Sequence, residues 1–377
     1  MAATDTADVQ KGLKGVTADE TAISTIDPDR DTLLYRGYPV EELAARCSFE
    51  EVVHLLVEGD LPTCEQLDDL RAQERGLRKL SDRLHEVIAR FPASAHPMDT
   101  LRTGVSFLGL EADGVRPGDP PTRRQAVELQ AKIPTIVAAA RRHARGEDPV
   151  APRDDLGIAA NFFWMCFGEL TDDEVVAAFD TSLILYAEHS FNASAFATRV
   201  VVSTESDLFG ATAAAIAALK GRLHGGANEA VVEMLEEVAR PQNAAGWVSR
   251  ALDEGRKIMG FGHRVYQHGD SRVPPMKQQL ERVAEVRGER GWVELADAVE
   301  RAMDEAKGLF PNVDFPAGPA YRLMGFETQL FTPIFVLART PGWSAHALEQ
   351  AADNVLIRPV AAYTGPGPRD VRPIEER

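Results

Sequence analysis

Apolar residues recur at helical spacing over most of the chain, which predicts a mainly α-helical protein. Ser48 stands three positions before Glu51, at the start of an apolar run that ends at Gly59. This spacing is typical of a capping box at a helix N-terminus. Thr171 and Glu174 repeat the pattern before a second apolar face, so a second capping box is predicted there.

Three further segments are predicted to be helical. Residues 156–167 form an apolar run that is too short to span a bilayer and contains Asn161, which favours a buried helix. Residues 210–220 are rich in alanine, the residue with the highest helix propensity. Residues 229–238 resume the helical pattern after a short break.

Strand-like sequence is confined to the start of the chain. Residues 21–26 and 32–35 flank a turn-rich insert at 27–31, which predicts a β-hairpin. The proline- and charge-rich residues 113–123 and 145–155 are predicted to be surface loops. A chain of 377 residues is too large for one simple core, so two domains are expected. The predicted fold class is mostly α, with a small N-terminal β-hairpin.

Acidic residues outnumber basic ones, with 58 Asp and Glu against 41 Lys and Arg, and the net charge is −17. Only eight of the cations are lysines. Surplus carboxylate with little lysine is the surface expected of a protein from a salt-loving organism, where screening removes the self-repulsion. An acidic protein from an ordinary GC-rich bacterium is the alternative. Because no basic stripe is present, nucleic-acid binding is not expected.

Several classes of protein are disfavoured by what the sequence lacks. It has no apolar run of bilayer length, and its first residues are acidic without the apolar core of a signal peptide, so a soluble cytoplasmic protein is expected. The three cysteines and nine histidines have no metal-binding spacing, so no metal is expected. Neither glycine-rich phosphate-binding pattern is present, which argues against nucleotide-driven or hydride-transfer chemistry.

Three ionisable residues lie in glycine- or proline-flanked breaks between predicted helices: His224, His263 and Asp314. Helix breaks present side chains and free backbone groups to a cleft. Two histidines and one carboxylate are the groups needed to remove a carbon-bound proton and to protonate a carbonyl. The sequence therefore suggests chemistry at a carbon–carbon bond.

Each of the three has a plainer interpretation as well. His224, beside two glycines, can donate a hydrogen bond to a developing enolate, or it can be a capping or packing histidine. His263, with Arg272 following, suits a loop that clasps an anion, or a solvated basic loop. Asp314 lies among apolar residues, which would raise its proton affinity as a base requires, or it is an ordinary helix N-cap.

Taken together and in order, the motifs resemble the citrate synthase family, in the short form of archaea and Gram-positive bacteria. The resemblance runs over residues 12–366. The matching motifs are residues 12–16, 20–24, 34–38, 61–63, 96–99, 188–194, 223–228, 260–266, 311–314, 338–340, 342–343, 358–359 and 363–366.

The resemblance implies a mostly helical homodimer whose active sites are shared between the two subunits. It implies a large domain formed by residues 1–221 and 331–377, and a small domain formed by residues 222–330. The family condenses acetyl-CoA with oxaloacetate and hydrolyses the thioester product to citrate and CoA. It does so without a metal or another cofactor.

The resemblance also implies roles for individual residues. Asp314 would remove a methyl proton from acetyl-CoA, His224 would stabilise the enolate oxygen, and His263 would protonate the oxaloacetate carbonyl. Guanidinium groups suit a dianion, because two parallel hydrogen bonds fix a carboxylate. The residues expected to hold oxaloacetate, the last of them from the partner subunit, are His189, Arg272, Arg339 and Arg358. Those expected to bind CoA are Lys257, Gly260, Phe261, Gly262 and Lys307.

Three departures from the family pattern bear on the substrate. Gln267 replaces a Lys or Arg expected to contact CoA phosphate, Ser271 replaces a proline, and Pro316–Ala317 replaces Tyr-Ser beside the proposed base. Since one methylene changes discrimination by only about 1–3 kcal/mol, 2-methylcitrate synthesis from propionyl-CoA is an alternative. A non-catalytic paralogue that binds CoA is a more remote one.

If the acidic surface is an adaptation to salt, the melting temperature should rise as KCl increases from 0.1 to 3 M. Repulsion between carboxylates loosens the fold at low ionic strength, and at 1 M salt the Debye length is only about 3 Å. Thermal unfolding followed by circular dichroism across this range is the measurement. A melting temperature that stays flat or falls would leave the ordinary acidic protein as the interpretation.

Overall fold

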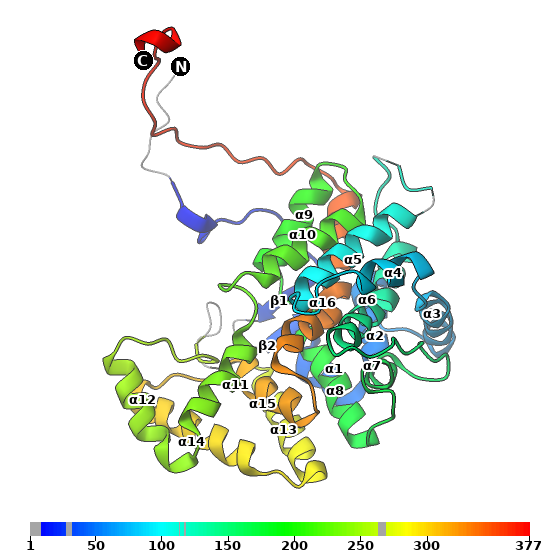
Figure 1. Cartoon of the computed structure of the whole chain (residues 1–377), viewed down its shortest axis with the longest axis vertical. Helices are drawn as coiled ribbons and strands as arrows, with labels where there is room; N and C mark the ends of the chain where they lie inside the picture. Colours follow the sequence, from blue (N-terminus) through cyan, green and yellow to red (C-terminus); the bar gives the residue numbers. More distant parts are fainter. Residues whose placement is uncertain (1–8, 28–31, 113, 117, 263–268) are drawn as a thin grey trace.

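The computed structural model describes residues 9–27, 32–112, 114–116, 118–262 and 269–377 of the chain. The described part is mainly helical, with one small antiparallel sheet near the N-terminus, as Figure 1 shows. The predicted fold class is therefore confirmed.

The strands are β1 (Ser24–Asp27), β2 (Thr32–Tyr35) and β3 (Tyr38–Pro39). The α-helices are α1 (Val40–Arg46), α2 (Phe49–Glu58), α3 (Cys64–Leu77), α4 (Asp82–Ala89), α5 (Pro97–Glu111), α6 (Arg123–Ala144), α7 (Ile158–Phe167), α8 (Asp173–Tyr186), α9 (Ala193–Ser203), α10 (Leu208–Lys220), α11 (Ala227–Val238), α12 (Ala244–Asp253), α13 (Val273–Arg287), α14 (Gly291–Lys307), α15 (Asp314–Leu323) and α16 (Phe331–Ala352). Short 3-10 turns occur at Lys11–Leu13, Pro241–Asn243, Thr328–Leu330 and Ile374–Glu376.

The predicted hairpin is present, and the sheet has one strand more than the sequence indicated. Strands β1 and β2 pair antiparallel, with Ser24 opposite Tyr35. The chain then turns at Gly37, which has φ of +89°, and the two-residue strand β3 pairs back onto β2. A strand of two residues is too short to produce a periodic pattern, which is why the sequence gave no sign of it.

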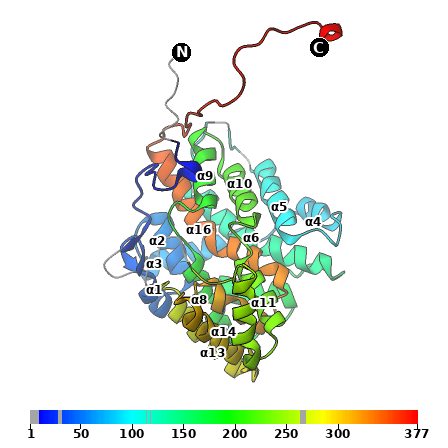
Figure 2. The ribbon, with the colours of Figure 1, turned by 90° about the vertical axis from the view of Figure 1, so that its left-hand side faces the viewer.

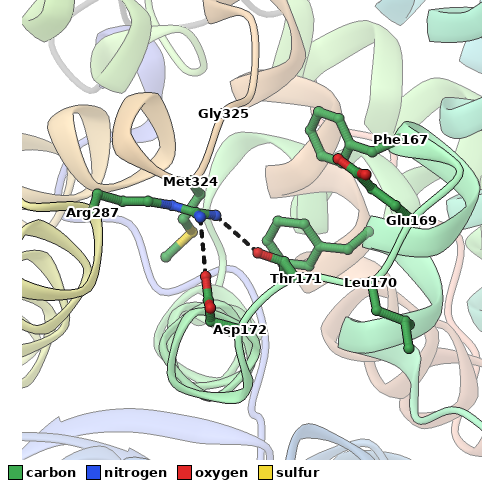
Figure 3. A pocket seen from close by; sticks show the side chains of 9 residues that line it. Phe167, Glu169, Leu170, Thr171, Asp172, Arg287, Met324 and Gly325 are labelled. Atoms are coloured by element: carbon green, nitrogen blue, oxygen red, sulfur yellow. Dashed lines mark hydrogen bonds and ion pairs between the residues drawn. The ribbon is translucent and has the colours of Figure 1, made fainter.

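The first predicted capping box is confirmed and the second is wrong. Ser48 and Glu51 satisfy each other's backbone groups at the start of α2, and Gly59 ends that helix in the left-handed conformation. Helix α8, however, begins at Asp173 with Asp172 as its N-cap residue. The Thr171 hydroxyl instead accepts a hydrogen bond from Arg287 at 2.8 Å, beside the Arg287–Asp172 ion pair (Figure 3). A partner distant in the sequence has displaced the local cap.

The predicted helical segments are present as α7, α10 and α11. Asn161, the polar residue of α7, is buried, and its side-chain oxygen accepts a hydrogen bond of 2.9 Å from the Arg153 backbone. This hydrogen bond gives the buried amide oxygen a partner, without which its burial would destabilise the fold. Within the described part of the chain, no helix has both the length and the apolar character needed to cross a membrane.

The buried apolar residues form two clusters. The larger one surrounds α16, whose sides pack against α2, α6, α8, α9 and α10. The smaller one is built from α11, α12, α14 and the start of α15, which lie together at the lower end of the molecule in Figure 1. Helix α15 contributes Phe315 to the smaller cluster and Ala317 to the larger one. Because this helix belongs to both clusters, the division into residues 222–330 and the remainder stays a prediction.

Exposed apolar side chains occur in the C-terminal tail and among the first described residues. After α16 the tail extends away from the helices (Figures 1 and 2). It exposes apolar side chains, among them Val360 and Tyr363, to solvent. Near the N-terminus, Val9, Leu13 and Val16 are exposed as well. These apolar side chains stay exposed in the single chain.

Candidate active site

The turn between α10 and α11 presents His224 at a surface hollow. Gly225 lies so close to the Leu219 carbonyl that a β-carbon there would overlap it. Gly226 has φ of +77° and is the N-cap of α11. The two glycines thus allow the chain to reverse tightly around His224, as the sequence predicted.

The surroundings of His224 fix its protonation state. Burial, and then the charge of Arg339, lower the pKa of His224 to about 4, so the ring is neutral at pH 7. Its Nε2 atom accepts a hydrogen bond from the Ser194 backbone N–H at 3.2 Å and lies 2.8 Å from the Ser194 hydroxyl. A ring nitrogen that accepts from an N–H carries no proton, so the proton is on Nδ1. His224 can therefore donate a hydrogen bond through Nδ1.

A short antiparallel contact joins the motif that begins at Gly260 to the motif that begins at Pro311. Phe261 and Pro311 form an isolated β-bridge. The Gly262 N–H donates to the Phe310 carbonyl at 3.1 Å, and the Asn312 N–H donates to the Gly260 carbonyl at 2.8 Å. This contact holds the segment that leads into His263 against the segment that leads into Asp314. His263 itself, like Gln267, lies outside the described residues.

Asp314 is the first residue of α15 and is half-buried at the cavity wall. Val313 is the N-cap, so Asp314 is not the capping residue of the plainer interpretation. The Tyr186 hydroxyl donates to Asp314 Oδ1 at 2.6 Å. Burial raises the pKa of Asp314 above the usual aspartate value, and the Tyr186 hydrogen bond and the charge of Arg272 limit the rise. The predicted increase in proton affinity is confirmed in direction.

Two of the predicted arginines are buried near Asp314. Arg272 forms a bidentate ion pair with Asp270, with contacts of 2.9 and 2.8 Å. Asp270 also accepts a hydrogen bond from the Val313 backbone N–H at 3.1 Å, which ties the pair to the start of α15. Arg339, on α16, donates from Nε to the Tyr186 carbonyl at 2.6 Å. Both guanidinium groups lower the pKa of the neighbouring Asp314.

One cavity brings several of the predicted residues together. It has a volume of about 700 Å³, and His189, His224, Gly262 and Asp314 are among its lining residues. His189 lies between α8 and α9, where Asn192 caps α9. Strands β1 and β2 close another side of the cavity. The motifs that are far apart in the sequence therefore meet at one place.

The lining of this cavity does not include Gly260, Phe261, Arg272 or Arg339, nor three further predicted residues, which are exposed. Lys257 is exposed and lines a neighbouring cavity of about 340 Å³, which shares His224 and Leu223 with the first one. Lys307 is exposed at the C-terminal end of α14. Arg358 is exposed in the tail that leaves the helical body. Their contacts with substrate stay predictions.

Four residues that shape the site were not identified as functional from the sequence. Tyr186 bonds Asp314, Ser194 orients His224, and Asp270 pairs with Arg272. Glu188 is fully buried and accepts hydrogen bonds from Ser24 at 3.0 Å and His346 at 2.9 Å. Glu188 and Ser194 do stand in the motif around His189, but a motif does not say which side chain bonds which.

The departure at Ser271 has a structural role. Its hydroxyl accepts a hydrogen bond from the Leu33 backbone N–H at 3.2 Å, so it joins β2 to the segment that carries Arg272. The departure at Pro316–Ala317 places two buried residues in the first turn of α15, where a proline needs no N–H partner. Among the residues that the structure describes, no group of His, Cys, Asp or Glu is arranged to hold a metal ion.

The arrangement suits proton abstraction next to a carbonyl group. A half-buried carboxylate can accept a carbon-bound proton, and a neutral histidine can donate a hydrogen bond to the enolate that results. Buried arginines beside them favour an anionic second substrate.

Comparisons with known proteins agree with this chemistry. The profile of the family described as "Citrate synthase, C-terminal domain" matches residues 12–360. The chain belongs to the citrate synthase family. It is therefore an acyltransferase of the citrate synthase type.

Individual relatives cover nearly the whole chain. A 2-methylcitrate synthase of Mycobacterium tuberculosis is 52% identical over 95% of this chain and 91% of its own. A citrate synthase of Mycolicibacterium smegmatis is 50% identical over 95% of both. The solved citrate synthase of Thermoplasma acidophilum, a ternary complex with carboxymethyl coenzyme A and oxaloacetate, has a TM-score of 0.91 and 32% identity. It covers 98% of this chain and 100% of its own. The family is thus shown, while its named members differ in substrate.

Replacing Gly260 with alanine should destabilise the protein more than the same change at Gly262. Both residues have positive φ, +79° and +76°, so both variants carry the same backbone strain. A β-carbon at Gly260 would also lie 2.8 Å from side chains of Phe315 and Val231, whereas one at Gly262 would meet nothing within 4 Å. We expect Gly260→Ala to lose about 1–3 kcal/mol more unfolding free energy than Gly262→Ala, measured by urea denaturation. Equal losses would mean that the close approach is unimportant.

Proposed function

We propose that the protein condenses acetyl-CoA with oxaloacetate and hydrolyses the product to citrate and CoA. The observation that carries this proposal is the placement of Asp314 and a neutral His224 on the wall of one cavity. The reaction needs a base that takes a proton from the enolisable carbon and a hydrogen-bond donor to the neighbouring carbonyl oxygen. Acetyl-CoA is a substrate here, and the proposed reaction requires no cofactor or metal.

The proposed sequence begins with the methyl group of acetyl-CoA. Asp314 removes one methyl proton, and the Nδ1–H of His224 hydrogen-bonds the thioester oxygen as it gains negative charge. The enolate carbon then attacks the ketone carbon of oxaloacetate, and His263 gives a proton to the ketone oxygen. Water finally hydrolyses the citryl thioester, which releases citrate and CoA.

The proposed binding groups follow from charge. Oxaloacetate carries two carboxylates; His189 lines the cavity. Arg272 and Arg339 lie close enough to Asp314 to lower its pKa. The proposed CoA contacts come from the segment that pairs with residues 310–312 and from two exposed lysines. These residues are Lys257, Gly260, Phe261, Gly262 and Lys307.

Propionyl-CoA is the second candidate substrate, and its product would be 2-methylcitrate. The 52% identity to a 2-methylcitrate synthase supports it, against 50% for a citrate synthase. We place the reaction in the cytoplasm, as a step of the tricarboxylic acid cycle.

With oxaloacetate as the second substrate, kcat/KM should be higher for acetyl-CoA than for propionyl-CoA. One extra methylene in a closed pocket changes discrimination by about 10- to 200-fold, so the ratio should lie in that range. Release of free thiol measures both reactions. A higher kcat/KM for propionyl-CoA would make 2-methylcitrate synthesis the function.

The variant Asp314→Asn is the control for these measurements. It keeps the size of the side chain and removes the base, so kcat should fall by about 10²–10⁴-fold while oxaloacetate binding persists. Turnover near that of the unaltered protein would remove Asp314 from the proposed mechanism. Absence of thiol release with both acyl-CoAs in the unaltered protein would contradict the proposed function itself.

We further propose a homodimer in which Arg358 completes the partner's site. The exposed apolar tail and N-terminal residues support this, because a second copy would bury surface that the single chain leaves in water. Arg358 lies exposed in that tail.

Chains carrying Arg358→Ala and chains carrying His224→Ala should each be inactive alone and regain activity as a heterodimer. One of the two sites in the heterodimer would then hold both an intact His224 and an intact Arg358. The measurement is thiol release by heterodimers purified through two different affinity tags. Inactive heterodimers of normal mass would place Arg358 in the site of its own subunit.

A further inference from the structure

Tyr186 touches two parts of the site through different atoms. It is the last residue of α8 and is almost fully buried. Its hydroxyl donates to Asp314 Oδ1 at 2.6 Å, while its backbone carbonyl accepts from Arg339 Nε at 2.6 Å.

We propose that Tyr186 is a positioning residue for the reaction. By occupying Oδ1, its hydroxyl fixes the plane of the Asp314 carboxylate and leaves Oδ2 as the oxygen that can reach the acyl-CoA. Its backbone carbonyl also fixes the guanidinium of Arg339, because it accepts the hydrogen bond from Nε. The inference rests on the proposed function, because it assumes that Asp314 is the base.

The surroundings of Tyr186 make it a rigid support. Its ring packs on Phe335, with ring centroids 4.7 Å apart, and Phe335 in turn lies under the Arg339 guanidinium at 4.7 Å. Burial, and then the charge of Asp314, raise the pKa of Tyr186 well above its usual value. The hydroxyl therefore keeps its proton and acts only as a donor to the carboxylate.

The hydroxyl also helps to keep Asp314 charged. Burial raises the pKa of Asp314, and the Tyr186 hydrogen bond is the largest influence that lowers it. Arg272 and Arg339 lower this pKa as well, and Asp270 raises it. Without the hydroxyl the pKa of Asp314 rises, so a larger share of the carboxylate is protonated and unable to act as a base.

Tyr321 offers a matched control. It lies on α15, the helix that begins with Asp314, and is fully buried. Its hydroxyl donates to Ser182 at 3.1 Å. Removing either tyrosine hydroxyl takes one hydrogen bond from the interior, but only the change at Tyr186 alters a partner of Asp314.

The experiment compares Tyr186→Phe with Tyr321→Phe by measuring kcat and kcat/KM for acetyl-CoA between pH 5 and 9. Tyr186→Phe keeps the ring and the backbone carbonyl, so the KM for oxaloacetate should stay within about twofold. Its kcat should fall by up to about 10²-fold, the cost of a misplaced reacting group. The acid limb of its kcat/KM profile should move to higher pH, whereas Tyr321→Phe should leave this limb in place.

The outcomes separate this inference from the proposed function. If Asp314→Asn is inactive and Tyr186→Phe keeps both its kcat and its acid limb, the positioning role is wrong and the base assignment stands. If both tyrosine variants lose activity equally with no movement of the acid limb, Tyr186 serves only stability, and the inference is again overturned. If Asp314→Asn retains normal turnover, Asp314 is not the base and the inference is overturned, whereas absence of thiol release by the unaltered protein would contradict the proposed function.

Discussion

The Asp314 carboxylate lies where protein replaces much of the surrounding water, and the groups packed around it oppose the effect of that burial on its charge. Burial alone would favour the neutral acid. Tyr186, Arg272 and Arg339 oppose it, and each comes from a different element: the end of α8, the residue before α13, and the middle of α16. The charge state of one carboxylate thus depends on how three helices pack, which links the stability of the large cluster to the chemistry of the cavity.

Close backbone approaches make this packing possible. Gly342 allows α16 to approach the Ala187 carbonyl at the end of α8, and a β-carbon there would overlap that oxygen. Gly318 similarly allows α15 to approach α11, because a β-carbon at Gly318 would lie only 2.6 Å from the Asn228 carbonyl oxygen. Gly225 does the same for the turn that holds His224. These glycines set the distances between helices, so the geometry of the site depends on residues that carry no chemistry of their own.

The three-stranded sheet is too small to be stable alone, and its anchors explain its presence. Ser24 bonds the buried Glu188, the Tyr35 hydroxyl donates to the Glu188 carbonyl at 3.0 Å, and the Leu33 N–H donates to Ser271. The sheet therefore spans from the loop that carries His189 to the segment that carries Arg272. It closes one wall of the cavity and connects two groups of proposed ligands for oxaloacetate.

The sequence by itself determined the helical class, the hairpin, the α2 capping box and the breaks at His224 and Asp314, because each depends on a local pattern of a few residues. It also indicated the family, because the motifs and their order can be recognised without knowing which residues contact one another. It failed at Thr171, whose hydroxyl is bonded by the distant Arg287, and at the two-residue strand β3. Only the tertiary structure decided that Tyr186 would bond Asp314, that Ser194 would fix the proton of His224 on Nδ1, and that Asp270 would hold Arg272. Tyr186 and Ser194 are distant in sequence from the residues they bond, and which side chains meet is fixed by helix packing rather than by any local preference.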